Sequence, residues 1–222
     1  MGLWMIQSVK KEFEEGYVYE GKKDDDFPQT QPILECRDLT FGYSKGKTHL
    51  EHISFTVDKG EMVAIVSRNG AGKSTLAKLI CGFETPNSGE LFLNGESMAG
   101  HTIRERAAKI GYVMQNPNQM ISKVMIAEEV ALGLITRKKP EDEITKSVED
   151  TLRICGLYPF RKWPISALSF GQKKRVTIAS VLVMGPELII LDEPTAVLTV
   201  QEIEKLFNVL RKMKEEGHSI II

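Results

Sequence analysis

The feature that most limits the possible folds of this chain is an apolar run. It leads into a glycine-containing turn and then into a helix. Met62-Val63-Ala64-Ile65-Val66 is entirely apolar, as in a central parallel strand that is covered on both faces. The next residues read Ser67-Arg68-Asn69-Gly70-Ala71-Gly72-Lys73-Ser74-Thr75, and Leu76, Leu79 and Ile80 follow at helical spacing. Strand, glycine-rich turn and helix in this order are the sequence context of a phosphate-binding loop.

The residue types in this turn suit the chemistry of holding a polyphosphate. Gly70 and Gly72 allow the backbone to wrap closely, so that successive amide N–H groups point at a phosphate. The N-terminus of the helix adds partial positive charge. Lys73 would reach the β- and γ-phosphates, and the Ser74 hydroxyl would bind Mg²⁺. The predicted nucleotide-binding residues of the turn are Asn69, Gly70, Ala71, Gly72, Lys73, Ser74 and Thr75.

Ser67 departs from this pattern, because it stands where the first glycine of the loop belongs. A small residue can still make the turn if its backbone φ stays negative. The alternative to nucleotide binding is a glycine-rich turn with a purely structural role.

Composition and charge limit the remaining function classes. The 222 residues are 42% hydrophobic and 27% charged, which is ordinary for a soluble globular protein. A formal net charge of -1 argues against nucleic acid or an anionic lipid surface as the main partner. No apolar run is long enough to span a bilayer, so we expect any link to a membrane to pass through a partner. Cys36, Cys81 and Cys155 are scattered and should be reduced, buried small residues in the cytosol.

Strands that alternate with helices predict an α/β fold with a mainly parallel sheet and no internal repeat. Residues 1–31 form a charge-dense lead-in or linker, and residues 32–222 form the ordered domain, with a helical region at about 117–169. The expected strands, besides 62–66, are 33–36, 53–57, 90–93, 110–114, 188–191 and one that begins at 219, and the expected later helices are 144–155 and 203–213.

A second buried run ends in two carboxylates. Leu188-Ile189-Ile190-Leu191 is followed by Asp192 and Glu193, at the strand end where open α/β sheets bind ligands. Asp192 would hold Mg²⁺, and Glu193 would orient the attacking water for phosphoryl transfer. A lone Asp-Glu pair could equally cap a loop, but its place after a phosphate-binding loop favours the catalytic interpretation.

Leu168-Ser169-Phe170-Gly171-Gln172 indicates the family. Read alone, Ser169 is a helix N-cap with Val176, Ala179 and Val183 buried behind it. The segment nevertheless closely resembles the LSGGQ signature of the ABC (ATP-binding cassette) ATPases, with Phe170 at the tolerant middle position. The resemblance covers about residues 33–222. It implies that Ser169, Phe170, Gly171 and Gln172 meet the γ-phosphate of ATP bound on a second subunit.

The resemblance carries further expectations. The fold would be a P-loop ATPase with a RecA-like core, an antiparallel β subdomain and a helical subdomain. Tyr43 would be the A-loop aromatic that stacks on adenine, and Gln115 the Q-loop glutamine that contacts Mg²⁺ and water. ATP and Mg²⁺ would be the cofactors, and Ser74, Gln115 and Asp192 would surround the metal. The partners would be a second ABC ATPase half and membrane proteins at the cytoplasmic face of the membrane, with no nucleic acid.

The sequence around the predicted Q-loop glutamine resembles one branch of that family. Gln115-Asn116-Pro117-Asn118-Gln119 followed by Glu128-Glu129-Val130-Ala131 is similar to the energy-coupling-factor ATPases. That branch powers importers of vitamins, thiamine precursors and metal ions such as cobalt. Its ATPases sit beneath a transmembrane coupling protein and a separate membrane substrate-binding protein. The charged lead-in also suits the second half of a tandem ATPase.

Two departures from the family bear on catalysis. The D-loop aspartate is replaced by Thr199, within Ala196-Val197-Leu198-Thr199. The family's switch histidine would follow the strand that begins at Ser219, and the sequence stops at Ile222, so we expect a truncated chain with poor turnover by itself. His218 precedes that strand and is expected at the surface. One alternative is therefore a degenerate half-site that binds ATP while a partner hydrolyses it. A separate alternative is a non-transport ABC ATPase.

Overall fold

The computed structural model describes residues 4–7, 32–44, 48–68 and 70–222. The chain divides into two compact units, Met1–Arg106 with Ile221–Ile222, and Ala107–Ile220. Of the predicted lead-in, only strand β1 (Trp4–Gln7) is described; it pairs antiparallel with β4 and was not anticipated. The rest of the lead-in lies outside the described residues.

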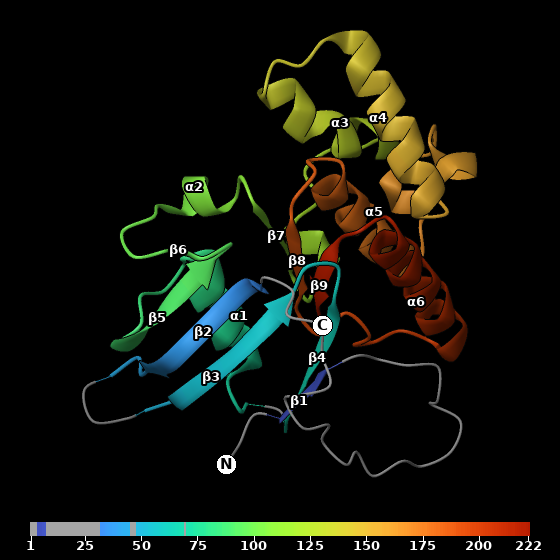
Figure 1. The fold of residues 1–222 in the computed structure, drawn as a ribbon. Helices are drawn as coiled ribbons and strands as arrows, with labels where there is room; N and C mark the ends of the chain where they lie inside the picture. Colours follow the sequence, from blue (N-terminus) through green and yellow to red (C-terminus); the bar gives the residue numbers. More distant parts are fainter. Residues whose placement is uncertain (1–3, 8–31, 45–47, 69) are drawn as a thin grey trace. The chain divides into compact units, whose positions relative to one another are not determined.

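An antiparallel sheet fills much of the first unit (Figure 1). Its strand order is β3-β2-β5-β6, formed by Leu50–Asp58, Pro32–Phe41, Ser88–Leu93 and Glu96–Ser97. The long β2 lies between β3 and β5 and buries Leu34, Cys36 and Leu39. These strands extend the predicted segments 33–36, 53–57 and 90–93, and they agree with the expected antiparallel β subdomain.

The phosphate-loop segment of the first unit has the predicted order of elements. Strand β4 (Met62–Val66) comes first, and helix α1 (Lys73–Cys81) follows the turn. Ile222 forms two hydrogen bonds with β4. Its N–H donates to Val63 O at 2.9 Å, and its carbonyl accepts from Ile65 N–H at 2.7 Å. Helix α1 buries Leu76, Leu79 and Ile80, as predicted, and ends at Gly82, whose φ is 82°.

Two parallel strands form the centre of the second unit. Strand β7 (Ile110–Val113) pairs in parallel with β8 (Leu188–Leu191), with Val113 opposite Leu191. All four residues of β8 are buried, as the apolar run predicted. Strand β9 (Ser219–Ile221) starts beside the beginning of β8, where Ser219 N–H donates to Glu187 O. The carboxyl ends of β7 and β8 therefore lie at the same edge.

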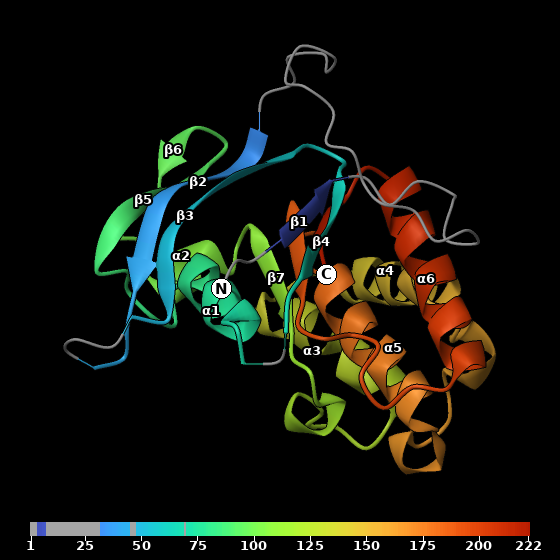
Figure 2. The same ribbon diagram turned by 90° about the horizontal axis from the view of Figure 1, so that it is seen from below.

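Four helices make up most of the rest of the second unit (Figure 2). They are α3 (Ile126–Thr136), α4 (Glu141–Ile154), α5 (Phe170–Leu182) and α6 (Val200–Glu215). Helix α5 contacts the other three. The three 3₁₀ turns of this unit are Pro117–Gln119, Tyr158–Phe160 and Ile165–Ala167. The predicted helices within 144–155 and 203–213 are confirmed. Within the described part of the chain, no helix has the length and apolarity needed to cross a bilayer.

All three cysteines are buried and unbridged, as predicted. Burial raises the pKa of the Cys36, Cys81 and Cys155 thiols to about 12. These thiols therefore stay neutral at physiological pH, and they serve as packing residues.

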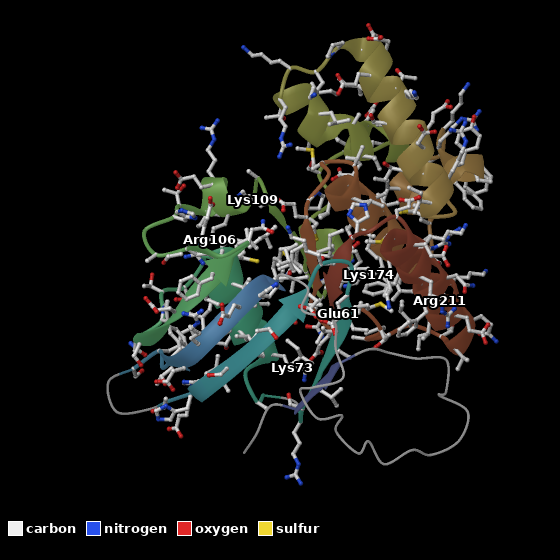
Figure 3. The ribbon with its side chains drawn as sticks, viewed as in Figure 1. Glu61, Lys73, Arg106, Lys109, Lys174 and Arg211 are labelled. Atoms are coloured by element: carbon white, nitrogen blue, oxygen red, sulfur yellow. The ribbon has the colours of Figure 1, made fainter. Side chains whose placement is uncertain are left out.

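A buried arginine holds the end of α1. Arg106, at the end of the short helix α2 (Ile103–Arg106), is 9% exposed. Its guanidinium donates to Leu79 O at 2.9 Å, Ile80 O at 3.1 Å and Met98 O at 2.8 Å. A cation at carbonyls of the last helical turn also offsets the helix dipole. Arg106, labelled in Figure 3, thus anchors the helix that begins with the phosphate loop.

We predict that Arg106→Met lowers the free energy of unfolding by about 2–4 kcal/mol, because three carbonyls lose their charged donor. Arg104→Met, an exposed position of the same short helix, is the matched control and should change stability little. Urea unfolding of both variants measures the difference. Equal stability of the two variants would contradict this role of Arg106.

Candidate functional site

The phosphate loop of the first unit has the backbone that the sequence predicted. Gly70 and Gly72 both have left-handed φ values, 80° and 102°. Gly72 caps α1, and its carbonyl accepts from Leu76 N–H at 2.8 Å. A side chain on Gly72 would meet Leu50 Cδ2 at 2.7 Å, whereas nothing lies within 4 Å of the same position on Gly70. The loop backbone therefore packs against Leu50 at Gly72, and the space next to Gly70 is empty. A ligand can approach the backbone at Gly70.

The residues around this turn agree with a phosphate-binding role. Ser67 has no positive φ, which meets the condition for a non-glycine residue there. Lys73 Nζ donates to Ser67 O at 3.3 Å, so the ammonium lies over the loop. Ala71 N–H closes the turn onto Arg68 O at 3.2 Å. Ser74 and Thr75 follow in the first turn of α1. Asn69 lies outside the described residues.

Tyr43 lies beside the start of α1. Its hydroxyl is 3.2 Å from Thr75 Oγ1, and its ring packs edge-on against Phe41 and His49. Half of its surface remains exposed. The first unit therefore brings the predicted A-loop aromatic and the phosphate-loop helix together and leaves the aromatic ring accessible. Adenine stacking itself stays a prediction.

In the second unit, the ends of β7 and β8 bring the predicted carboxylates and glutamine together. Gln115 Nε2 donates to Glu193 Oε2 at 2.8 Å. Tyr112 OH donates to Asp192 Oδ2 at 3.0 Å, and Asp192 N–H donates to Val113 O at 2.9 Å. The parallel pairing of the two strands causes this convergence, because it places both strand ends at one edge. The sequence did not identify Tyr112 as a partner of Asp192.

Glu193 has a strained backbone. Its φ is 42°, in the left-handed region, although it is neither glycine nor asparagine. Such a conformation costs about 1–3 kcal/mol and is found most often at functional sites. Pro194 follows it in the sequence, so the chain direction after Glu193 is also restricted. The strained backbone at Glu193 is thus unfavourable for stability, and it fixes the direction of this residue at the end of β8.

The signature segment is a helix N-cap, as its sequence also suggested. Ser169 Oγ accepts from Gln172 N–H at 3.2 Å, and Gln172 Oε1 accepts from Ser169 N–H at 2.9 Å, which completes a capping box. Phe170 and Gly171 begin α5. Val176 and Ala179 are fully buried behind them, and Val183 is half-buried. The N-cap interpretation is confirmed, and it is compatible with phosphate binding at the same helix end.

Glu202, in the first turn of α6, contacts this segment and was not identified from the sequence. Its Oε1 accepts from Ser169 Oγ at 2.8 Å and from Gly171 N–H at 3.2 Å. Its Oε2 accepts from Thr199 N–H at 3.1 Å and from Thr199 Oγ1 at 3.3 Å. The Thr-x-x-Glu spacing of Thr199 and Glu202 is a capping-box pattern. The sequence could therefore have predicted the contacts of Glu202 with Thr199, but not those with Ser169 and Gly171.

Lys174 is a second missed residue. Although it is a lysine, it is only 1% exposed (labelled in Figure 3). Its Nζ donates to Met114 O at 2.7 Å and to Gln115 O at 2.9 Å, so α5 holds the backbone that carries Gln115. Burial lowers the pKa of Lys174 to about 8, and the charge of Asp192 opposes that shift. The signal in the sequence was its spacing from Gly171 and Ile178, which share the buried face of α5.

Three residues that the sequence analysis considered next to the departures from the family pattern lie within the described part of the chain. Thr199 is the N-cap of α6 and accepts from Glu202 N–H at 3.3 Å. Val197 has a left-handed φ of 67° and is 84% exposed, which is unusual for a branched side chain. His218 is half-buried rather than fully at the surface, and its ring Nδ1 lies 3.2 Å from Pro186 O.

Comparison with known proteins identifies the family of these segments. The model of the ABC transporter family matches residues 50–196. A relative from Enterococcus faecalis, named "Putative ABC transporter ATP-binding protein", is 54% identical over 191 residues, which cover 86% of this chain and 34% of that protein. A relative of the same description from Clostridium perfringens is 51% identical, with 86% and 34% covered. The chain thus spans about a third of the length of the curated relatives it matches.

Solved structures agree with this fold. The cbiO1 protein of Clostridium perfringens, described as part of the ABC transporter complex cbiONQ, superposes with a TM-score of 0.81 at 36% identity. That match covers 86% of this chain and 77% of cbiO1. The ADP conformation of MJ1267, an ATP-binding cassette of an ABC transporter, gives a TM-score of 0.77 at 25% identity, with 87% and 81% covered.

The buried Lys174 generates a prediction about pH. Its pKa in the folded chain, about 8, lies below the ordinary 10.5. Between these values the unfolded chain keeps the proton that the folded chain has released, so the contribution of Lys174 to stability rises with pH.

We expect the free energy of unfolding of the parent chain, minus that of Lys174→Met, to grow by roughly 1–2 kcal/mol from pH 7.5 to 9.5. Urea unfolding at the two pH values gives this difference. The same comparison with Lys173→Met should show little change. A difference that stays flat or shrinks across this window would show that Lys174 keeps its proton in the folded chain.

Proposed function

The chain belongs to the ABC transporter family of ATP-binding proteins, and on that premise we propose that it is the ATP-binding and ATP-hydrolysing subunit that powers a membrane importer of the energy-coupling-factor type. The observation that carries the hydrolytic part is the contact of Gln115 with Glu193 at the ends of two parallel strands. A carboxylate held by an amide in this way can orient a water molecule for attack on a phosphate.

ATP binding is assigned to the first unit. The left-handed Gly70 and Gly72, the helix N-terminus of α1 and the Lys73 ammonium suit the β- and γ-phosphates. Tyr43, half exposed beside Thr75, suits the adenine ring. Mg²⁺ prefers oxygen ligands, and Ser74, Asp192 and Gln115 would supply them. The metal would neutralise phosphate charge, while these residues hold it and position the water.

Partnership with a second ABC ATPase half follows from the signature segment. In the family, Ser169, Phe170, Gly171 and Gln172 would complete the nucleotide site of another subunit. Val197 of the D-loop segment is 84% exposed, and Val200, the first residue of α6, is 70% exposed. A second ATPase half that covered these two valines would bury apolar surface. The other partners would be a transmembrane coupling protein and a membrane substrate-binding protein, at the cytoplasmic face of the membrane.

Two observations support the energy-coupling-factor branch over other ABC importers. The Gln115-Asn116-Pro117 segment and Glu128-Glu129-Val130-Ala131 resemble that branch in sequence. The structure is similar to cbiO1, which is described as part of the cbiONQ transporter complex. The transported molecule would be a vitamin, a thiamine precursor or a metal ion.

Thr199 favours one alternative function, a degenerate half-site that binds ATP while a partner hydrolyses it. It replaces the charged D-loop residue of the family and caps α6 instead. The contact of Glu193 with Gln115 supports the catalytic role, because it holds the carboxylate at the end of β8, where it could position a water molecule.

We predict that Glu193→Gln lowers Mg²⁺-dependent ATP turnover about a hundredfold or more, because the carboxylate that orients the water is lost. The complex should be recovered with its partners through a tag on this chain. Glu187→Gln, at the opposite end of β8, is the matched control and should leave turnover near the parent value.

Unchanged turnover in Glu193→Gln would support the degenerate half-site instead. The composition of the recovered complex tests the transport assignment. Membrane proteins are the expected partners, and ribosomes or DNA would indicate a non-transport ABC ATPase.

A further inference from the structure

We infer that Glu202 is an internal anion that competes for the signature donors with the terminal phosphate of a partner-bound ATP, which must displace it. The inference rests on the proposed function, which assigns these donors to that phosphate. It adds a residue that sets how much ATP is needed to close the pair of ATPase halves.

The contacts of Glu202 are divided between its two oxygens. Oε2 serves the capping box of α6, by accepting from Thr199 N–H and Oγ1. Oε1 serves the other helix, by accepting from Ser169 Oγ at 2.8 Å and Gly171 N–H at 3.2 Å. A capping box needs only one acceptor at this position, so the capping of α6 does not account for the second set of contacts.

The donors bound to Oε1 are those that a phosphate oxygen would use. A serine hydroxyl and a backbone N–H at the N-terminus of α5 form an anion-binding arrangement. Carboxylate and phosphate are both oxyanions, and each requires the same hydrogens at the same place. Occupation by Glu202 and by phosphate is therefore mutually exclusive, unless the side chain of Glu202 rotates away.

The surroundings provide room and charge for this exchange. A surface pocket of about 210 Å³ is lined by Ser169, Gly171, Gln172, Arg175, Glu202 and Lys205. The pocket volume is larger than the combined volume of several water molecules, each of which takes up about 30 Å³ in the liquid. Arg175 and Lys205 are cations, so an incoming phosphate would be attracted, and Glu202 would retain a favourable environment after it moves aside.

Glu202 is ionised under physiological conditions. The hydrogen bond from the Thr199 backbone, followed by that from the Ser169 side chain, lowers the pKa of its carboxyl. The competing group is thus a charged one, whose removal should matter more than the loss of a neutral hydrogen bond. A glutamine at this position would keep an oxygen for the capping box but would carry no charge.

The test uses the complex recovered with its partners and measures KM and kcat for ATP. Glu202→Gln should lower KM about two- to tenfold, with a smaller change in kcat, because a weaker competitor is displaced. Glu204→Gln, an exposed carboxylate on the same helix, is the matched control and should leave KM unchanged. Glu202→Ala, which also loses the capping bond, should shift KM in the same direction.

Thermal unfolding of each variant separates stability from competition, and Glu202→Gln should melt close to the parent because its cap persists. An unchanged or raised KM in a folded Glu202→Gln variant would overturn the inference and leave Glu202 as a cap only. A parent complex that does not hydrolyse ATP, or hydrolyses it equally well after Glu193→Gln, would contradict the proposed function instead.

Discussion

The left-handed turn at Gly72 is the constraint on which the proposed nucleotide site of the first unit depends. Its φ of 102° directs the chain from the loop into α1, and its carbonyl accepts the first hydrogen bond of that helix. Leu50 lies where a side chain would project, so only glycine fits both the backbone and the space. Lys73 follows immediately and reaches back to Ser67 O. At the other end of α1, Arg106 fixes the last turn.

Buried or strained residues organise the second unit around the end of β8. Glu193 is held in a left-handed backbone, and Lys174 reaches from α5 to the carbonyls of Met114 and Gln115. A buried ammonium that loses its acceptors would be costly, so the start of the signature helix and the Gln115 segment should move together. The segment that would sense the partner's phosphate is thereby connected to the segment that would position the water.

The sequence predicted the elements that have strong local patterns. The apolar runs at 62–66 and 188–191 became strands β4 and β8, and Gly82 ended α1. It did not predict the pairing of β1 with β4, because the charge of the surrounding lead-in masked a four-residue strand. Lys174 and Glu202 were missed for another reason. Their roles depend on residues 60 and 33 positions away in the sequence, which only the packing of the second unit brings close.

The most direct test of this account is the affinity of the chain for ATP with and without Mg²⁺, measured by titration calorimetry. We predict Mg²⁺-dependent binding that Lys73→Ala weakens at least about tenfold, since a charged contact to the phosphates is lost. Lys78→Ala, in the last turn of the same helix, should leave the affinity near that of the parent chain. Binding that does not need Mg²⁺, or that survives Lys73→Ala intact, would contradict the central claim that this loop and its lysine hold a triphosphate.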